Sequence, residues 1–575
     1  MQTRLAPRLV RMFESAANYL IDNVECSEDR VPHNGRRAYL WTILKLLREN
    51  SLSEQWMRAE TDLAAKLFAD IKKSPSGEWV IYPGSQDNRN LSTNAIDCGI
   101  VVDAYYDMVN DIRNTSAEWA DLISKVALTY NAKKVNGNPV IQNQILWCST
   151  GLARWYKETE YSHHHEMVEK ILKRVIKSWL SYRNVDGSFP YMTDKHQPWL
   201  WGTTTYYHSR EIAFASYIAN LIEFKSSALQ RALLLSTKYL LKMYTPAGTK
   251  QLGLESKRYY FWNDVESGSH PFDIYAFYLA FEQTHDITWK KAAGASLESL
   301  LKIQFPAPST GAGEKKHRNT WQCPTMRMSH VAWLARIPVE FLNDCLDIGL
   351  SQLHIPDSVS KPSSLDSLVL IGNSRQWIHF TSRKTPLSGW AGQRANGLLV
   401  GQLNDPMNLR SKTPLAYQIS NNPIVFLRKN SILLIKSLRH ALFSARYLIR
   451  NKRQWWLALQ FIKQEFFNYS LIAATERRSE FVCKLSDVNI KHRTIEHRLE
   501  ASDVIGENIA QLGNRTIIWN DEVITVVDRI NRRGVYKVLV PEGWEAEVNG
   551  KLVDGPYIKF SAPTKVIYSF SQAMR

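Results

Sequence analysis

One structural unit recurs along residues 1–340 of this chain. Each copy joins an amphipathic helix to a helix that is apolar nearly all round, through a glycine turn and a long loop of aromatic and polar residues. The spacing of about 50 to 65 residues suits one helical hairpin and one loop per copy. It predicts a closed or stacked array of helix pairs. The turns centre on Gly77, Gly137, Gly187, Gly248 and Gly311–Gly313.

The two kinds of helix predict two layers. Residues 167–182 carry apolar side chains on one stripe and Lys, Arg and Glu opposite, which is typical of an outer helix with one face in water. Residues 145–148, 212–222 and 274–281 are too apolar to face water and predict inner helices. A ring of inner helices wrapped by outer ones is an α/α toroid. The N-termini of its inner helices converge on one end, where we expect the chemistry.

The C-terminal third has a different pattern. Residues 356–364 have the composition of a linker, and short β-rich runs bounded by turn residues follow. Runs such as 516–519, 523–527, 536–540 and 565–570 predict an antiparallel meander. The predicted fold class is therefore α+β, with a complete or incomplete α/α toroid over residues 1–355 and an antiparallel β-sandwich over residues 365–575.

A helical insertion is predicted at residues 438–467. It places Trp455, Trp456 and other aromatic residues among Arg and Lys, and no Asp or Glu occurs between Asp405 and Glu465. Such a cationic helix lies in a membrane interface or packs with its basic side on an anionic ligand. A core-packed helix with a solvated basic face explains the pattern equally well.

The net charge of +17 indicates anionic partners. We expect an acidic polysaccharide and an anionic membrane surface. Nucleic acid is not expected, because no helix-turn-helix, RNP-like strand or zinc finger is recognised. A surplus of Lys and Arg that serves only solubility stays an alternative.

Cofactors and targeting signals are not indicated. The six cysteines form no CxxC pair, so neither a disulfide framework nor a zinc site is expected. The run His163–His165 precedes an outer helix and is not expected to bind metal. A metal requirement stays open. No signal peptide or membrane-spanning stretch is recognised, which predicts a cytoplasmic protein or one peripheral to the inner face of the membrane.

The strongest cluster of reactive side chains enters the third inner helix. It comprises Trp201, Tyr206, Tyr207, His208 and Arg210. A Tyr transfers a proton when a cation lies beside it, a His is a base near neutral pH, and an Arg neutralises a carboxylate. Alternatively, the His caps or packs and the Arg pairs with the Glu that follows it.

Two later units add charged candidates. His270 precedes Pro271, which suits a first helical turn, so we expect its side chain to be exposed at the ring mouth as a second acid or base. Arg327 and His330 are spaced to lie on one helix face.

Amides and aromatic rings complete the expected site. Asn94, Asn143 and Gln322 would bind a carboxylate or hydroxyl groups, although such amides also cap helices. Trp262 and Trp321 offer flat faces for sugar rings, although core packing explains them equally well.

This layout resembles the polysaccharide lyases that combine an N-terminal α/α toroid with a C-terminal antiparallel β-sheet region, the group of heparinase III, chondroitin AC lyase and alginate lyase. The resemblance implies β-elimination on a uronate: an Asn with an Arg or His neutralises the carboxylate, and a Tyr, with or without a His, transfers the C5 proton. Carried over by position, Asn143 resembles the neutralising amide. Tyr207 and His208 resemble the proton-transfer pair, and His270 and Arg327 resemble auxiliary groups.

Three other functions stay open. A uronyl C5-epimerase removes the same proton and returns it to the other face of the sugar. A toroidal glycoside hydrolase needs two carboxylates, for which Asp97, Asp264, Glu266 and Asp273 are available. A non-catalytic protein would hold the polysaccharide in the toroid while the basic helix docks it to a membrane. The identity of the polymer and endo or exo action are open as well.

Overall fold

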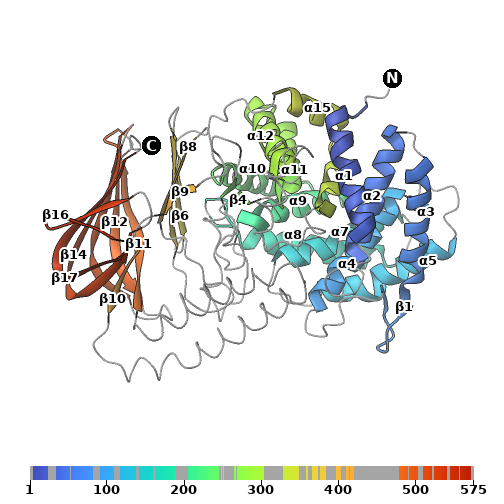
Figure 1. The fold of residues 1–575 in the computed structure, drawn as a ribbon. Coiled ribbons are helices and arrows are strands. Elements are labelled where there is room, and N and C mark those ends of the chain that lie inside the picture. The colour runs from blue at the N-terminus through green and yellow to red at the C-terminus, as the bar shows by residue number, and fades with distance from the viewer. Residues whose placement is uncertain are drawn as a thin grey trace. The chain divides into compact units, whose positions relative to one another are not determined.

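The described residues divide into two compact units (Figure 1). Met1–Lys195, Thr205–Leu241 and Glu266–Leu353 form the first unit, and His196–Thr204, Lys242–Val265 and His354–Arg575 form the second. The computed structural model describes residues 4–23, 34–51, 54–81, 91–108, 117–136, 142–159, 163–184, 186–189, 205–244, 248, 250–251, 265–266, 268–303, 328–348, 358–360, 366–372, 376–383, 397–402, 409–412, 415–419, 478–489, 491–502, 509–520, 523–540, 544–555 and 557–571.

The first unit is an α/α toroid built around a closed ring. Each ring segment contacts the next one along the chain, and the last segment, η6, contacts the first, α2. The ring is therefore complete, and its interior is the core of this unit. The ring segments are α2 (Asn34–Ser51), α4 (Leu91–Met108), α7 (Gln142–Glu158), α9 (Thr205–Leu221), α11 (His270–Thr284) and the short 3-10 helix η6 (His330–Arg336).

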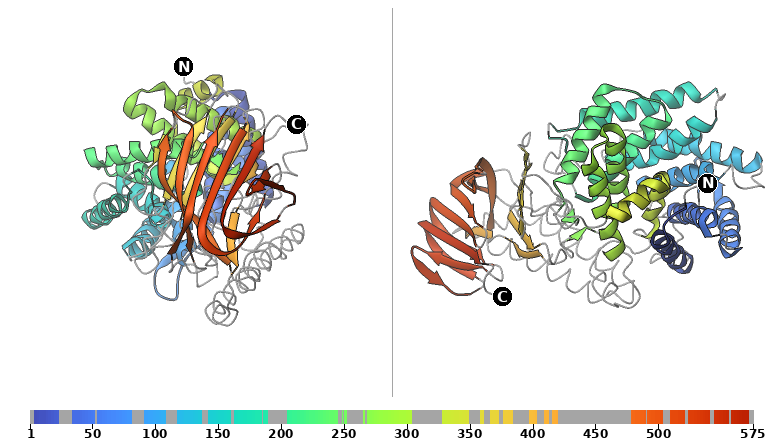
Figure 2. Two further views of the ribbon diagram at one scale, coloured as in Figure 1. Left: turned by 90° about the vertical axis from the view of Figure 1, so that its left-hand side faces the viewer. Right: turned by 90° about the horizontal axis from the view of Figure 1, so that it is seen from above.

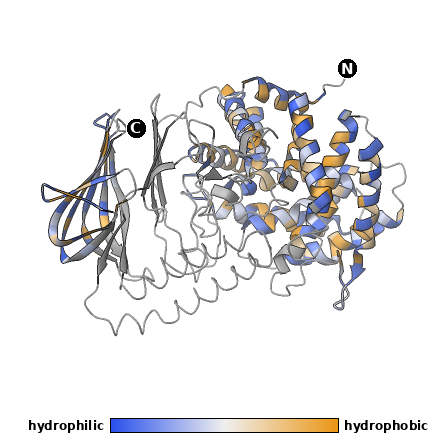
Figure 3. Cartoon of the chain, in the orientation of Figure 1, coloured by the Kyte–Doolittle hydropathy of each residue, from blue (hydrophilic) through white to orange (hydrophobic). Residues whose placement is uncertain are grey.

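An outer layer of helices wraps the ring. Helix α3 packs on α2, α8 on α7, α10 on α9 and α12 on α11. Hydrophobic and hydrophilic residues alternate in bands along the helices (Figure 3), as one wet face requires. The outer elements are α1 (Pro7–Asn23), α3 (Glu54–Ala69), α5 (Ala117–Lys125), the π-helical turn η1 (Val126–Asn131), α6 (Ala132–Asn136), α8 (His165–Ser181), α10 (Ser227–Leu241), α12 (Ile287–Ile303) and α15 (Val339–Ile348).

Helix α8 tests the expected amphipathic stripe. The predicted apolar face is buried from Ile171 to Trp179, and this part of the prediction is confirmed. Met167 was expected on that face, but 43% of it is exposed. The helix begins at His165, and the buried positions repeat from Val168 at helical spacing, so position 167 falls beside the stripe.

The outer layer is fastened where the chain's first helix meets its last ones. The backbone N–H of Ala6 donates to Oδ1 of Asn343 at 2.9 Å, and Nη2 of Arg8 donates to Oε2 of Glu298 at 3.0 Å. Helices α12 and α15 therefore hold the start of α1, although these residues are about 300 positions apart in sequence.

Aromatic side chains fill the middle of the ring. Trp147, Phe214, Phe272 and Trp333 are all buried, and the ring contacts within this group span 5.1 to 6.5 Å, centroid to centroid. Both indole N–H groups donate to the phenol oxygen of Tyr39. These residues come from different ring segments, so the aromatic layer ties the ring together at one depth.

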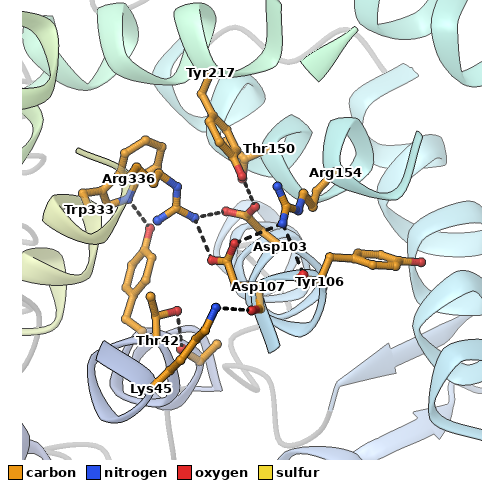
Figure 4. A network of polar contacts seen from close by, with 12 residues as sticks. Thr42, Lys45, Asp103, Tyr106, Asp107, Thr150, Arg154, Tyr217, Trp333 and Arg336 are labelled. Atoms are coloured by element: carbon orange, nitrogen blue, oxygen red, sulfur yellow. Dashed lines mark hydrogen bonds and ion pairs between the residues drawn. The ribbon is translucent and has the colours of Figure 1, made fainter. Parts of the chain in front are cut away.

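A buried ionic network lies towards the C-terminal ends of the ring helices (Figure 4). Arg336 of η6 forms an ion pair with Asp103 of α4 and lies 3.7 Å from Asp107, which is also 3.4 Å from Arg154. The hydroxyl of Tyr217 donates to Oδ1 of Asp103 at 2.6 Å. Burial raises the pKa of Asp107, against the pull of both arginines. Two carboxylates and two guanidinium groups thus balance in charge.

Helices α4 and α7 approach each other through two glycines. A Cβ atom added at Gly151 would lie 2.2 Å from the carbonyl oxygen of Gly99, and one added at Gly99 would lie 2.8 Å from the carbonyl oxygen of Cys148. Both distances are far below van der Waals contact, so only glycine allows this approach.

The C-terminal region is antiparallel, as predicted. One sheet has the order β5-β6-β7-β8-β9, and the other has the order β10-β11-β12-β13-β14-β17-β15-β16 (Figure 2, left). The strands are β5 (Ser358–Ser360), β6 (Asp366–Gly372), β7 (Gln376–Arg383), β8 (Gly397–Gln402), β9 (Leu409–Lys412), β10 (Leu415–Ile419), β11 (Arg478–Asn489), β12 (Thr494–Ser502), β13 (Ile509–Trp519), β14 (Val523–Leu539), β15 (Glu545–Val548), β16 (Lys551–Val553) and β17 (Tyr557–Ser571). Two small antiparallel pairs, β1 (Ile71–Lys73) with β2 (Trp79–Ile81) and β3 (Lys250–Gln251) with β4 (Val265–Glu266), complete the strands.

The larger sheet curls. One edge of β14 pairs with β13 along its first half and with β10 along its second half, while β10 also pairs with β11. The runs 523–527 and 536–540 were expected as separate strands, but they belong to the single strand β14, whose register with β17 shifts between Ile530 and Gly534. Within the sheet core, Arg515 and Asp528 face each other and form two hydrogen bonds of 2.6 and 2.7 Å.

Two sequence predictions concern membranes. The basic insertion at residues 438–467 lies outside the described residues. None of the described helices is long and apolar enough to cross a membrane.

The close approach of α4 and α7 gives a stability prediction. Gly151→Ala is expected to lower the free energy of unfolding by about 3 kcal/mol, because its methyl group forces the two ring helices apart. Gly77→Ala is the control, since a Cβ there meets nothing within 4 Å and only the positive φ of 87° is strained. It should cost about 1 kcal/mol. Denaturant unfolding that gives equal losses would contradict the close approach.

Candidate active site at the ring mouth

The N-terminal ends of the ring helices meet at one end of the toroid. Arg210 in α9 contacts His330 at the start of η6, and Phe272 in the first turn of α11 packs against both. Tyr207 and His270 lie in the first turns of α9 and α11, at the same end of the ring. Helix N-termini carry unpaired N–H groups and a partial positive charge, so this end favours an anion. We call it the ring mouth.

Arg210 is the central cation of the ring mouth. Its exposed fraction is 1%, and its Nη2 lies 3.2 Å from Nδ1 of His330. The guanidinium carbon lies over three rings, at 5.0 Å from the centroid of Phe272, 5.3 Å from Trp147 and 5.4 Å from Tyr207. The aromatic faces hold the charge in a fixed position with few waters around it.

His330 is neutral in this environment. Burial, together with the charge of Arg210, holds the pKa of His330 well below its usual 6.5. A guanidinium group only donates, so Nδ1 accepts from Arg210 in the tautomer whose ring proton lies on Nε2. The carbonyl oxygen of Gly268, 3.1 Å from the same Nδ1, would accept a proton from the other tautomer. At neutral pH, His330 therefore offers an N–H donor rather than a second positive charge.

Asn143 lies at the start of α7 with a buried side chain. Its exposed fraction is 2%, and its Nδ2 finds no hydrogen-bond partner within the described part of the chain. A buried amide N–H without a partner is costly, so this group is suited to donate to an oxygen of a ligand. This placement fits the predicted neutralising amide, whose role stays a prediction.

Tyr207 is the predicted proton-transfer residue that reaches outward. It is half-buried, whereas Arg210 beneath it is fully buried. Its phenol ring is one of the three that cover the guanidinium. The structure thus brings together Tyr207, Arg210 and His330 of the predicted residues.

Asp97 and Arg36 add charges that the sequence did not single out together. Asp97 of α4 accepts the backbone N–H of Gly35, at the start of α2. Burial raises the pKa of Asp97 to about 7, although Arg36 and this hydrogen bond oppose the shift. Arg36 is half-buried and also disfavours the charged form of His330. The basic N-terminus of α2 precedes the first recognised glycine turn. It was the sequence signal that could have identified Arg36 as a residue of the site.

The two other predicted histidines face the outer layer. His208 is buried, and its Nε2 lies 2.9 Å from the carbonyl oxygen of Ser236 in α10. His270 is fully buried, and its Nδ1 lies 2.8 Å from Oγ of Ser296 in α12. The expected exposure of His270 is therefore wrong: Pro271 does begin the helix, but position 270 points between α11 and α12. The predicted catalytic roles of both residues stay untested.

The side chains of the remaining predicted site residues lie outside the described part of the chain. Only the backbones of Asn94 and Tyr206 are described, in the first turns of α4 and α9. Residues wholly outside the described parts are Trp201, Trp262, Asp264, Trp321, Gln322 and Arg327.

Among the described residues, no group of three or more His, Cys, Asp or Glu side chains is arranged to hold a metal ion.

Comparisons with known proteins give likeness in structure alone. No protein-family model and no curated protein matches the chain. A heparinase III structure is 10% identical, with a TM-score of 0.47 over 93% of this chain and 74% of that one. A chondroitin AC lyase of Streptomyces coelicolor, in complex with chondroitin sulphate, is 8% identical, with a TM-score of 0.47 over 99% and 79%. A sugar epimerase from a ruminal bacterium is 9% identical, with a TM-score of 0.38 over 53% and 86%.

The raised pKa of Asp97 predicts a pH-dependent stability difference. The folded protein favours the protonated carboxyl, so stability is complete below about pH 4 and falls as the pH rises through about 7. Asp97→Asn should therefore raise the free energy of unfolding at pH 8 by about 2 to 4 kcal/mol and leave it unchanged at pH 4. The exposed Asp62→Asn is the control for loss of a charge. A gain that is equal at both pH values would contradict the assignment.

Proposed function

We propose that the chain is a carbohydrate-active enzyme that cleaves a uronate-containing polysaccharide by β-elimination at the ring mouth. The observation that carries this proposal is the contact of Arg210 with neutral His330 where the ring helices begin, and the buried amide of Asn143 in the first turn of α7 supports it. One cation, two N–H donors and several helix N-termini suit a carboxylate bound next to the reacting carbon.

The chemistry follows from neutralising that carboxylate. The negative charge on the carboxylate increases as the C5–H bond breaks and an enolate-like state forms. Arg210 and the Asn143 amide stabilise this charge. The phenolate form of Tyr207 removes the C5 proton, and the phenol that results passes this proton to the glycosidic oxygen on C4. The C4–O bond breaks as the C4–C5 double bond forms, which leaves a 4,5-unsaturated uronate at the new end. The N–H on Nε2 of His330 is suited to donate to a carboxylate oxygen.

A uronyl C5-epimerase is the second candidate, because the same site would remove the proton and a group on the other sugar face would return it. It yields no double bond and, in heavy water, exchanges the C5 proton. The glycoside hydrolase stays an alternative as well, with Asp97 and Asp273 as two of the predicted carboxylates that the structure describes near the starts of ring helices. A non-catalytic protein would bind the polymer and leave it unchanged.

The proposal is tested with a panel of acidic polysaccharides. Ultraviolet absorbance of the unsaturated product should rise for at least one of them. Tyr207→Phe should lower kcat by about 100-fold or more and leave binding largely intact, because only the transferable proton is lost. Tyr156→Phe, at the opposite end of α7, is the matched control. An unchanged rate in Tyr207→Phe would remove this residue from the mechanism.

We also propose that residues 438–467 hold the protein at an anionic membrane surface, which would make it peripheral to the inner face. The support is the run of Arg, Lys and Trp, in which Glu465 is the one acidic residue. Full-length protein should co-sediment with vesicles that contain anionic lipid, and less so as salt rises. Replacement of Arg446, Arg450, Lys452 and Arg453 by Gln should weaken this binding and leave turnover unchanged. Equal co-sedimentation of both proteins would end the membrane proposal.

A further inference from the structure

Tyr39 occupies an unusual position in the aromatic layer. Its phenol oxygen accepts the indole N–H of Trp147 at 2.8 Å and the indole N–H of Trp333 at 2.9 Å. Tyr39 belongs to α2, Trp147 to α7 and Trp333 to η6, so one oxygen joins three ring segments. All three side chains are buried, with Tyr39 3% exposed. Neither indole N–H can turn to water if this acceptor is lost.

Each of the two indoles lies against the guanidinium group of an arginine. The guanidinium carbon of Arg210 lies 5.3 Å from the ring centroid of Trp147, and that of Arg336 lies 4.4 Å from the ring centroid of Trp333. Arg210 belongs to the ring mouth, whereas Arg336 belongs to the ionic network of Figure 4. The orientation of each indole therefore decides where a cation sits.

Tyr39 also touches the ring mouth directly. Its ring meets His330 edge-on, with centroids 6.2 Å apart, and stacks against Trp147 at 6.5 Å. His330 itself lies 5.9 Å from Trp147. Tyr39, Trp147 and His330 thus form one packed group on which the side chain of Arg210 rests.

We propose that Tyr39 is a positioning residue for the ring mouth: by accepting both indole N–H groups, it fixes the surface on which Arg210 and His330 are aligned towards an anionic ligand. The proposal rests on the proposed function only for the identity of that ligand. The geometric part stands by itself, since it concerns how the phenol oxygen orients two indoles and, through them, a guanidinium and an imidazole.

A purely structural Tyr in this core would need only one partner for its hydroxyl group. Here the oxygen has two donors from two different ring segments, α7 and η6, an arrangement that fixes their relative orientation as well as their packing. Tyr275 offers a matched contrast. It is also a buried ring residue and packs on Trp333 with centroids 5.7 Å apart, but it does not accept the indole N–H.

The test compares Tyr39→Phe with Tyr275→Phe in the full chain. Two-dimensional NMR follows the indole N–H signals of both tryptophans and the ring C–H signals of His330. In Tyr39→Phe both indole N–H signals should move upfield, because their acceptor is gone, and the His330 signals should shift. In Tyr275→Phe these signals should stay at their wild-type positions.

The second measurement is the kinetics on a polysaccharide that the panel of the preceding subsection identifies as a substrate. Tyr39→Phe should lower kcat by about 10- to 100-fold with KM changed by less than about threefold, as expected for misaligned groups. Tyr275→Phe should retain wild-type kcat. If Tyr39→Phe does not fold, Trp147→Phe tests the same surface and should also shift the His330 signals and lower kcat.

The outcomes separate the two proposals. If wild-type protein turns over none of the polysaccharides, the proposed function fails, and the NMR signals still decide the role of Tyr39. Shifts of the indole and His330 signals in Tyr39→Phe alone support positioning. The inference is overturned if the His330 signals stay unmoved in Tyr39→Phe, if both variants give the same changes, or if kcat is unaffected in an active enzyme.

Discussion

The ion pair between Arg336 and Asp103 is the contact on which the closed ring depends. It links the last ring segment, η6, to α4 across the interior, and Tyr217 of α9 binds the same carboxylate. Asp103 and Asp107 lie one turn apart on α4, so the negative charges of buried Asp103 and half-buried Asp107 would repel each other without the guanidinium groups. Loss of one partner leaves a buried charge uncompensated, which lowers the free energy of unfolding by about 3 to 5 kcal/mol. Only one placement of η6 satisfies all these groups.

The aromatic layer separates this network from the ring mouth, and the separation matters for electrostatics. A charge surrounded by aromatic rings has few water molecules to screen it, so Arg210 acts on a nearby anion in a medium of low dielectric constant. The same burial disfavours a second cation, which is why His330 stays neutral beside it. The ring mouth thus combines the permanent charges of buried Arg210 and half-buried Arg36 with neutral donors.

The sequence predicted the architecture well because that information is periodic. Hydrophobic spacing separated inner from outer helices, and the convergence of helix starts indicated which end holds the reactive side chains. It predicted the direction of individual side chains less well. His208 lies two positions from Arg210, which corresponds to about 200° around a helix, so one faces α10 while the other faces the ring interior. His270 shows the same difficulty with α12.

Contacts between distant segments were beyond reach of the sequence. The approach of Asp97 to Gly35 depends on which ring helices are neighbours, and so does the sharing of Tyr39 by two tryptophans. Similarly, two strand-like runs in the C-terminal sheet were recognised, but a register shift inside one long strand leaves no clear mark in hydropathy. Pairing and register are properties of the assembled chain.

The fastening of α1 to α12 and α15 bears on how the protein is made. Ala6 binds Asn343, and Arg8 binds Glu298, so the first helix finds its partners only after about 340 residues have been synthesised. Until then, α1 leaves the ribosome with an apolar face and without the helices that cover part of it. We expect the ring to close late, in a step slowed by the loss of chain entropy over a long loop, and partly built rings to be the species most in need of chaperones.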